Sequence, residues 1–172
     1  MGQSDFDTIG LGGVAVTASA AELNKTDGIP SGAFMVVAEE VTFSEAGPGT
    51  YTGEVDLPAG ATLLDIIVNA VALWAAGTSA TMDVGDTDPN GYYAGINLKA
   101  TDLLAGESIS FALAGGKAGA YIANSQVSPR YSATARTIIG TVVSEGAGTA
   151  GRTRMLVVYA APVSAVAATK AA

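Results

Sequence analysis

The stretch Tyr51-Thr52-Gly53-Glu54-Val55-Asp56-Leu57 decides the fold class, because apolar or small residues alternate in it with polar ones. Alternation with a period of two is typical of a strand that buries one face. The same period recurs at residues 80–84 and 108–113. Each segment has an ordinary strand length, so we expect a protein built from short β-strands.

Two further segments, Arg136–Ser144 and Arg152–Ala160, are rich in Val, Ile and Thr. Residues of this kind favour strands because their branched side chains pack well on a pleated surface. The connection Glu145–Gly151 contains three glycines. The pattern therefore predicts that the two segments form a hairpin with a mobile loop.

The segment Leu63–Ala76 fits two structures. A helix would place Asp65 and Asn69 on one stripe and the large apolar residues on another. A strand would place the same two polar residues on one face and alternate apolar residues on the other. We favour the strand, because the cluster Ile66-Ile67-Val68 is β-branched and strands are expected on both sides of it.

Residues 34–43, 92–99 and 118–123 complete a set of about nine short strands separated by Gly, Pro and Asp. Such spacing predicts an all-β protein: a β-sandwich, a jelly roll or a barrel. We expect a β-sandwich or jelly-roll-like single domain over residues 33–161. Residues 162–172 form an Ala-rich tail that we expect to be flexible.

Residues 1–32 lack a sustained hydrophobic period and contain the glycine-rich patch of residues 10–13, so we expect an extended N-terminal arm. One short helix is predicted in the arm, with Ser19 as N-cap, Glu22 as its capping-box partner, and Gly28 and Pro30 as the stop. A helix of about two turns is unstable alone in water. Its one large apolar residue, Leu23, therefore needs a partner surface.

The composition excludes several kinds of function. Without Cys or His, the chain has no thiolate or imidazole metal ligand, no Cys nucleophile and no Ser-His-Asp triad. A formal net charge of −8 disfavours binding to nucleic acid and to anionic membranes. The acidic first ten residues do not resemble a secretion signal, and the apolar run of residues 63–76 is too short and polar to span a bilayer. We expect no cofactor and no resident metal.

Charge is divided unevenly along the chain. Residues 1–116 hold 15 of the 16 acidic residues against Lys25 and Lys99, a balance of −13, and residues 117–172 have a balance of +5. Strands from the two halves could interleave in one sheet and neutralise each other. Alternatively, acidic and basic patches could dock between copies or onto a larger partner. The sequence leaves both interpretations open.

A few residues could carry chemistry. Asp86–Gly91 resembles the first half of a Ca²⁺-binding EF-hand loop, but the twelfth position is Asn97 rather than Glu, and a plain turn explains the same residues. The four carboxylates that could act as general acids or bases have no identifiable partner, and we expect solvated loop residues: Glu39, Glu40, Asp102 and Glu107. The aromatic residues that could stack on a sugar, or simply pack the core, are Trp74, Tyr92 and Tyr93.

One segment resembles a known motif. Thr17-Ala18-Ser19-Ala20-Ala21-Glu22-Leu23-Asn24-Lys25-Thr26-Asp27-Gly28 is similar to the T-A-x-A-A-E-L-N-x-L-D-G motif of tailed-bacteriophage head decoration proteins and tail fibres, with Thr26 where Leu is usual. The segment from Val55-Asp56-Leu57-Pro58-Ala59-Gly60-Ala61 to Leu156-Val157-Val158-Tyr159 looks like the β-rich domain of the decoration, or cement, proteins. The resemblance implies a homotrimeric β-domain at the capsid surface, made in the host cytoplasm, whose N-terminal arm grips the major capsid protein or a neighbouring copy.

These observations favour a virion structural protein that decorates and stabilises the capsid by protein–protein contacts, with no enzymatic activity. The alternative is a tail-fibre or receptor-binding module that recognises a host glycan. The residues expected to bind the capsid or another subunit lie in the arm and in the basic C-terminal part: Leu11, Val14, Val16, Leu23, Asn24, Ile29, Arg130, Arg136, Arg152 and Arg154.

Overall fold

The computed structural model describes residues 10–11, 14–15, 33–75, 77–123 and 130–163. The chain divides into two compact units, residues 1–33 and 34–172. In the first unit, β1 (Gly10–Leu11) and β2 (Val14–Ala15) form an antiparallel pair. The predicted helix of residues 19–28 lies outside the described residues.

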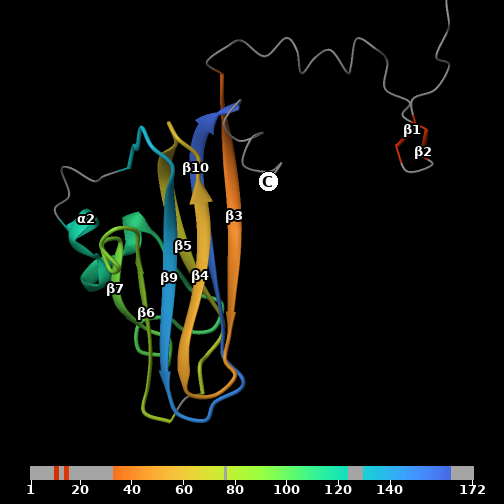
Figure 1. The fold of residues 1–172 in the computed structure, drawn as a ribbon. Coiled ribbons are helices and arrows are strands. Elements are labelled where there is room, and N and C mark those ends of the chain that lie inside the picture. The colour runs from red at the N-terminus through yellow and green to blue at the C-terminus, as the bar shows by residue number, and fades with distance from the viewer. Residues whose placement is uncertain (1–9, 12–13, 16–32, 76, 124–129, 164–172) are drawn as a thin grey trace, which may run out of the picture. The chain divides into compact units, whose positions relative to one another are not determined.

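The second unit is a sandwich of two four-stranded antiparallel sheets (Figure 1). One sheet has the strand order β3-β10-β5-β8 and the other has the order β4-β9-β6-β7. The strands of the first sheet are β3 (Phe34–Ser44), β10 (Arg152–Pro162), β5 (Thr62–Ala72) and β8 (Ser108–Ile109). Those of the second are β4 (Gly49–Leu57), β9 (Arg136–Glu145), β6 (Ser79–Gly85) and β7 (Tyr93–Asn97). The all-β sandwich predicted from the alternation is confirmed.

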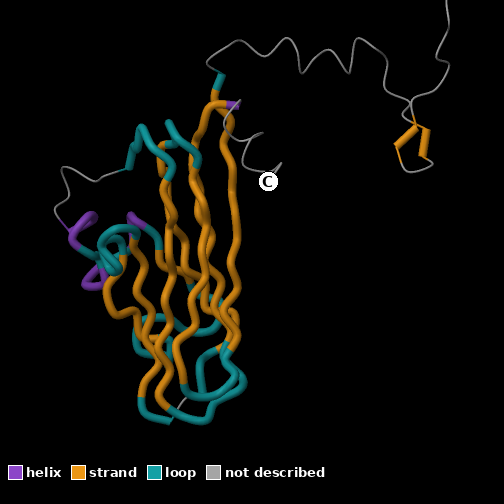
Figure 2. The backbone as a smooth tube through the Cα atoms, viewed as in Figure 1, coloured by secondary structure: helices purple, strands orange, loops and turns teal. Residues whose placement is uncertain are grey.

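The strand pairs are nested along the chain. β3 pairs with β10, β4 with β9, β5 with β8 and β6 with β7, as in a long antiparallel ribbon rolled into two sheets. Two further pairings, of β10 with β5 and of β9 with β6, close each sheet. This arrangement is jelly-roll-like. It places the start of β3 and the end of β10 side by side at one end of the sandwich, where Phe34 lies opposite Pro162 (Figure 2).

The core lies between the sheets and follows the alternation of the strands. On β5, for example, Leu63, Ile66 and Val68 are fully buried. A bulge at Leu64 shifts the alternation by one residue, so that Leu63 and Ile66 both point into the core. The largest side chains of the core are fully buried in the same way: Tyr92, Tyr93, Tyr159, Leu57, Met82, Ile96, Leu98, Ile138 and Met155. Gly140 leaves room for Phe43, because a Cβ there would lie 2.8 Å from the Phe43 ring.

Three connections at the end opposite Phe34 are tied together by one carboxylate. Glu45 is buried, and its Oε2 accepts hydrogen bonds from the backbone N–H groups of Ala75 (2.9 Å), Ala150 (3.2 Å) and Gly151 (2.9 Å). The acceptor follows β3, while the donors belong to the β5–β6 and β9–β10 connections. Glu45 therefore joins loops that are far apart in the sequence.

Several local predictions need correction. β9 and β10 are strands as predicted, but they do not form a hairpin, because each belongs to a different sheet and pairs with earlier strands. Residues 118–123 are not a strand: they contain the short helix α2 (Ala120–Ala123), in which Tyr121 packs edge-on against Tyr92. The expected strand at 108–113 is reduced to β8, followed by a 3-10 turn at Phe111–Leu113. For residues 63–76 the strand is confirmed as β5, which ends at Ala72.

Candidate docking surface

The outer face of the β3-β10-β5 sheet is made of rows of side chains fixed by the strand register. Starting from the end where the chain enters β3, the first complete row holds Val36, Ala160 and Thr62. Tyr131 extends this row, because it forms an isolated bridge with Thr62. The next rows hold Ala38, Val158 and Asp65, and then Glu40, Leu156 and Ile67.

The rows nearest the start of β3 form an exposed apolar patch. We define the upper patch as the apolar outward residues of the first two rows together with the residue that begins β3: Phe34, Val36, Ala38, Val158, Ala160 and Tyr131. The polar residues of the same rows, Thr62 and Asp65, lie on β5. Phe34 is 60% exposed, Val36 65% and Tyr131 63%. Large apolar side chains exposed side by side are uncommon on a monomer and mark surfaces that bind a partner.

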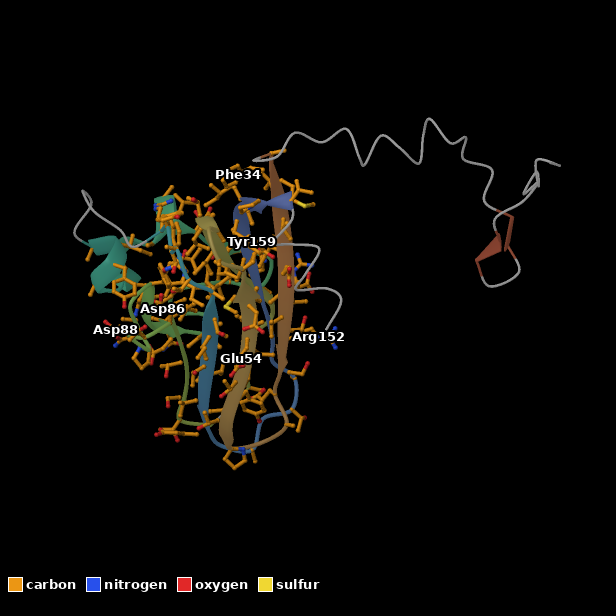
Figure 3. The ribbon with its side chains drawn as sticks, turned by 45° about the horizontal axis from the view of Figure 1, so that its top comes forward. Phe34, Glu54, Asp86, Asp88, Arg152 and Tyr159 are labelled. Atoms are coloured by element: carbon orange, nitrogen blue, oxygen red, sulfur yellow. The ribbon has the colours of Figure 1, made fainter. Side chains whose placement is uncertain are left out.

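The rows at the other end of this face are polar and carry two of the predicted arginines. Arg154 lies opposite Thr42 and Asn69, and its guanidinium contacts the Glu40 carboxylate at 3.4 Å. Arg152 lies one row further, opposite Ser44, and its side chain is exposed (Figure 3). The face is therefore apolar at the Phe34 end and carries charges of both signs at the other.

The outer face of the second sheet has a different character. The apolar residues Ile139 and Val143 lie in the middle of two of its rows, on β9. The other outward positions of β4, β9 and β6 are mainly threonines and acidic residues: Thr50, Thr52, Glu54, Asp56, Thr81, Asp83, Thr137 and Thr141. The Thr137 hydroxyl on β9 donates a hydrogen bond to the Asp56 carboxylate on the neighbouring strand β4. Small polar and anionic side chains hold water well, so this face is the natural solvent-facing side of the sandwich.

The other two predicted arginines make contacts within the domain. Arg136 is largely buried, and its guanidinium donates to the Asp86 carboxylate (3.3 Å) and the Tyr92 hydroxyl (3.0 Å). Burial raises the pKa of Tyr92 to about 12, although the Arg136 charge acts in the opposite direction. Arg130 lies over the Phe111 ring at 4.6 Å and donates to the Leu64 carbonyl. These contacts join the start of β9, at Arg136, and Arg130 to other segments of the domain.

The aromatic residues considered for sugar stacking belong to the core. Trp74 is 2% exposed, and its indole N–H donates to the Thr153 hydroxyl at 2.9 Å. Tyr92 and Tyr93 are fully buried, and the Tyr93 hydroxyl donates to the Ile66 carbonyl. Burial raises the pKa of Tyr93 above its usual value. None of these three rings presents a face to a ligand in solution.

The turn interpretation of residues 86–91 agrees with the structure. The N–H of Gly91 donates to the Asp88 carbonyl, and Asp86 faces Arg136 rather than a cation site. Asp86 and Asp88 lie on the flank away from β3 (Figure 3). In the part of the chain that the structure describes, no group of three or more Asp, Glu, His or Cys residues could hold a metal ion.

Most of the predicted arm residues cannot be placed. Val16, Leu23, Asn24 and Ile29 lie outside the described residues. Leu11 ends β1 and Val14 begins β2, where their backbones pair with each other. Docking by these residues stays a prediction, as it does for the four arginines.

The upper patch was missed by the sequence analysis, although the sequence carries a signal for it. The first five residues of β3 are Phe34-Met35-Val36-Val37-Ala38, a continuous apolar run without alternation. Such a run is typical of a strand that is buried on both faces. Among the described residues, only one face of this run is buried, at Val37.

Comparison with known proteins gives structural matches only. No protein-family model matches the sequence, and no curated protein sequence matches it. The chain is similar to a chain of the capsid of Ralstonia phage GP4, with 20% identity, coverage of 77% of this chain and 86% of the other, and a TM-score of 0.48. It is also similar to a chain of the acid-stable capsid of Helicobacter pylori bacteriophage KHP30 (15% identity, 72% and 94% coverage, TM-score 0.44). A chain of the cyanophage Pam1 capsid matches with 17% identity, 75% and 85% coverage, and a TM-score of 0.44.

A helix that crosses a bilayer must be both long and apolar. Among the described residues, no helix is long and apolar enough to cross a membrane.

Proposed function

We propose that this protein is a virion structural protein of a tailed bacteriophage that decorates the outside of the head and stabilises it by protein–protein contacts. The observation that carries the proposal is the difference between the two faces of the sandwich. One outer face has an exposed apolar patch and two exposed arginines, while on the other threonines and carboxylates predominate around Ile139 and Val143. A protein that lies on a shell needs one face for contacts and one for water.

The motif at residues 17–28 supports the same function, because it resembles a motif of head decoration proteins. In the proposal, the arm residues and the exposed arginines Arg152 and Arg154 contact the major capsid protein. The protein acts as a homotrimer, and the polar β4-β9-β6 face is turned to the solvent. Many identical contacts on one shell add their strength through multivalency.

The proposal is tested with heads of the parent phage prepared without this protein. Wild-type protein is expected to co-sediment with the heads and to raise the temperature at which they break open. Deletion of residues 1–30 is expected to abolish binding, and the double substitution Arg152→Glu, Arg154→Glu to weaken it by at least about tenfold.

Thr52→Lys, on the polar face, is the matched control and is expected to bind as the wild type does. Circular dichroism checks that each variant is folded. Full head binding by the deletion variant would contradict the proposed role of the arm, and failure of the wild type to bind heads would contradict the proposed function as a whole.

A further inference from the structure

The upper patch lies on an edge strand that lacks the usual protection against association. β3 pairs only with β10 among the described strands, so its other edge carries backbone groups that no described strand pairs. Edge strands usually carry charges that prevent contact with other chains. On β3 these charges, Glu39 and Glu40, begin only after Ala38. The first five residues of the strand are uncharged and include Phe34 and Val36.

We propose that the upper patch is a self-association surface that binds a second copy of this chain. The proposal deepens the proposed function, on which it rests for the place of the contact in a virion. It assigns different tasks to the two ends of one sheet face. The apolar end contacts another copy, and the charged end with Arg152 and Arg154 is left for the shell.

Charge favours a second copy at this position. Each molecule has a formal net charge of −8, so two copies repel each other over most of their surface. None of the six patch residues is charged. The carboxylate in their rows, Asp65, lies at the β5 side of the patch, where its Oδ1 accepts hydrogen bonds from the backbone N–H groups of Ile66 and Phe111. Apolar contact is therefore available at the β3 side of the patch without placing carboxylates against each other. The row beside the patch holds Glu40, with Arg154 in the next row, at 3.4 Å from each other. Two copies could exchange partners between these charges, and the contact would then remain neutral.

The size of the patch also fits a contact between copies. Phe34, Val36 and Tyr131 are each about three-fifths exposed, and with the smaller patch residues they offer on the order of 400 Å² of apolar surface. A standard interface buries about 800 Å² on each partner, with an apolar centre and a polar rim. The upper patch has the area of such a centre, and Thr62 and Asp65, which lie in the same rows, can supply part of the rim.

On the inner side of this region, the hydroxyl of Tyr159 already has a hydrogen-bond partner. Tyr159 lies opposite Val37, is 1% exposed, and donates a hydrogen bond to the Glu39 carboxylate at 2.7 Å. Substitutions on the outer side of β3 can therefore be made without disturbing this buried contact. Val36 is the best site, because it points outward in the middle of the patch and is 65% exposed.

The test measures association of the free, full-length protein by sedimentation velocity over a range of concentrations, without heads. The wild type is expected to self-associate, and Val36→Lys to raise the dissociation constant by at least about tenfold, as for a residue at the centre of an interface. Thr52→Lys, an equally simple charge addition on an exposed outward position of β4, is expected to leave association unchanged. Tyr131→Ser, outside the regular strands, replaces Val36→Lys if circular dichroism shows that the latter is unfolded.

A second readout uses the absence of native cysteine. In single-cysteine variants Val36→Cys and Thr52→Cys, a thiol reagent is expected to label position 36 progressively more slowly as protein concentration rises, and position 52 at a constant rate. A wild type that stays monomeric, or an association that is as strong in Val36→Lys and in Tyr131→Ser as in the wild type, would overturn the proposal. Neither result bears on head binding, which the previous experiment measures separately.

Discussion

Substitution of Glu45 is expected to loosen the end of the sandwich opposite the N-terminal end of β3. Its carboxylate accepts three backbone hydrogen bonds from two connections that are separated from it by 30 to 106 positions in the sequence. Hydrogen bonds to a charged group contribute about 1.5–3 kcal/mol each, but neighbouring ones do not add fully. Since water can reach part of this loop cluster after the change, we expect Glu45→Ala to lower the free energy of unfolding by about 3–5 kcal/mol.

The isosteric variant Glu45→Gln separates charge from shape. It keeps one oxygen as acceptor but loses the negative charge, so the expected loss is smaller, about 1–2 kcal/mol. For a domain of this size, 1 kcal/mol corresponds to about 2–4 °C in Tm. We therefore expect Glu45→Ala to lower Tm by roughly 6–20 °C and Glu45→Gln by roughly 2–8 °C.

Urea unfolding followed by tryptophan fluorescence provides the assay, because Trp74 lies beside this cluster: a Cβ on Gly151 would meet its ring at 2.5 Å. The control is Glu54→Gln on the exposed face of β4, which should change stability by less than about 0.5 kcal/mol. If Glu45→Ala and Glu54→Gln had the same stability, the three hydrogen bonds would not hold the loops together and the reasoning would be refuted.

Three further outcomes are expected. Burial raises the pKa of Tyr92 and Tyr159, so these side chains ionise in the unfolded chain before they ionise in the folded protein. Above pH 10 the free energy of unfolding should therefore fall by about 1.4 kcal/mol per pH unit for each such tyrosine. Urea midpoints measured between pH 9 and 11.5 would show this fall, and a flat profile would contradict it. Ala100→Gly should raise stability by up to about 1 kcal/mol, since Ala100 has a positive φ of 67°, and a lower Tm would count against this explanation. Trp74→Phe should cost about 1–3 kcal/mol by leaving the buried Thr153 hydroxyl without its donor, and recovery of this loss in the double variant with Thr153→Val would support that cause.

The fold class was predictable because alternation depends only on which face of a strand is buried. Residues 51–57 and 80–84 alternate because β4 and β6 each have one face in the core and one in water. Pairing was not predictable in the same way. β9 and β10 look like a hairpin because only a short glycine-containing segment separates them, but their partners are the strands β3 to β6 from the first half of the domain. Local sequence carries little information about such distant partners.

The predicted binding residues illustrate a second limit. All four arginines are polar residues near strands, and sequence alone does not distinguish Arg136, whose guanidinium is held by Asp86 and Tyr92, from Arg152, whose side chain is exposed. The difference arises from the register that places each side chain inside or outside a sheet. The upper patch is the opposite case: its apolar run is visible in the sequence, but only the structure shows that one of its two faces is left uncovered by the described chain.

The nested topology also favours the interpretation in which strands of the two halves neutralise each other. All six strand pairings of the domain join one strand from β3–β6 with one from β7–β10. Four of these pairings, those made by β9 and β10, bring strands of the acidic residues 1–116 beside strands of the basic residues 117–172, whereas β5–β8 and β6–β7 lie within residues 1–116. The three ion pairs of the described residues also connect these two parts, at Lys117–Asp102, Arg136–Asp86 and Arg154–Glu40, each joining a base beyond residue 116 to an acid before it. The outer β4-β9-β6 face keeps Glu54, Asp56 and Asp83 without a base in its rows, and an uncharged surface such as the upper patch is where two copies can approach with least repulsion.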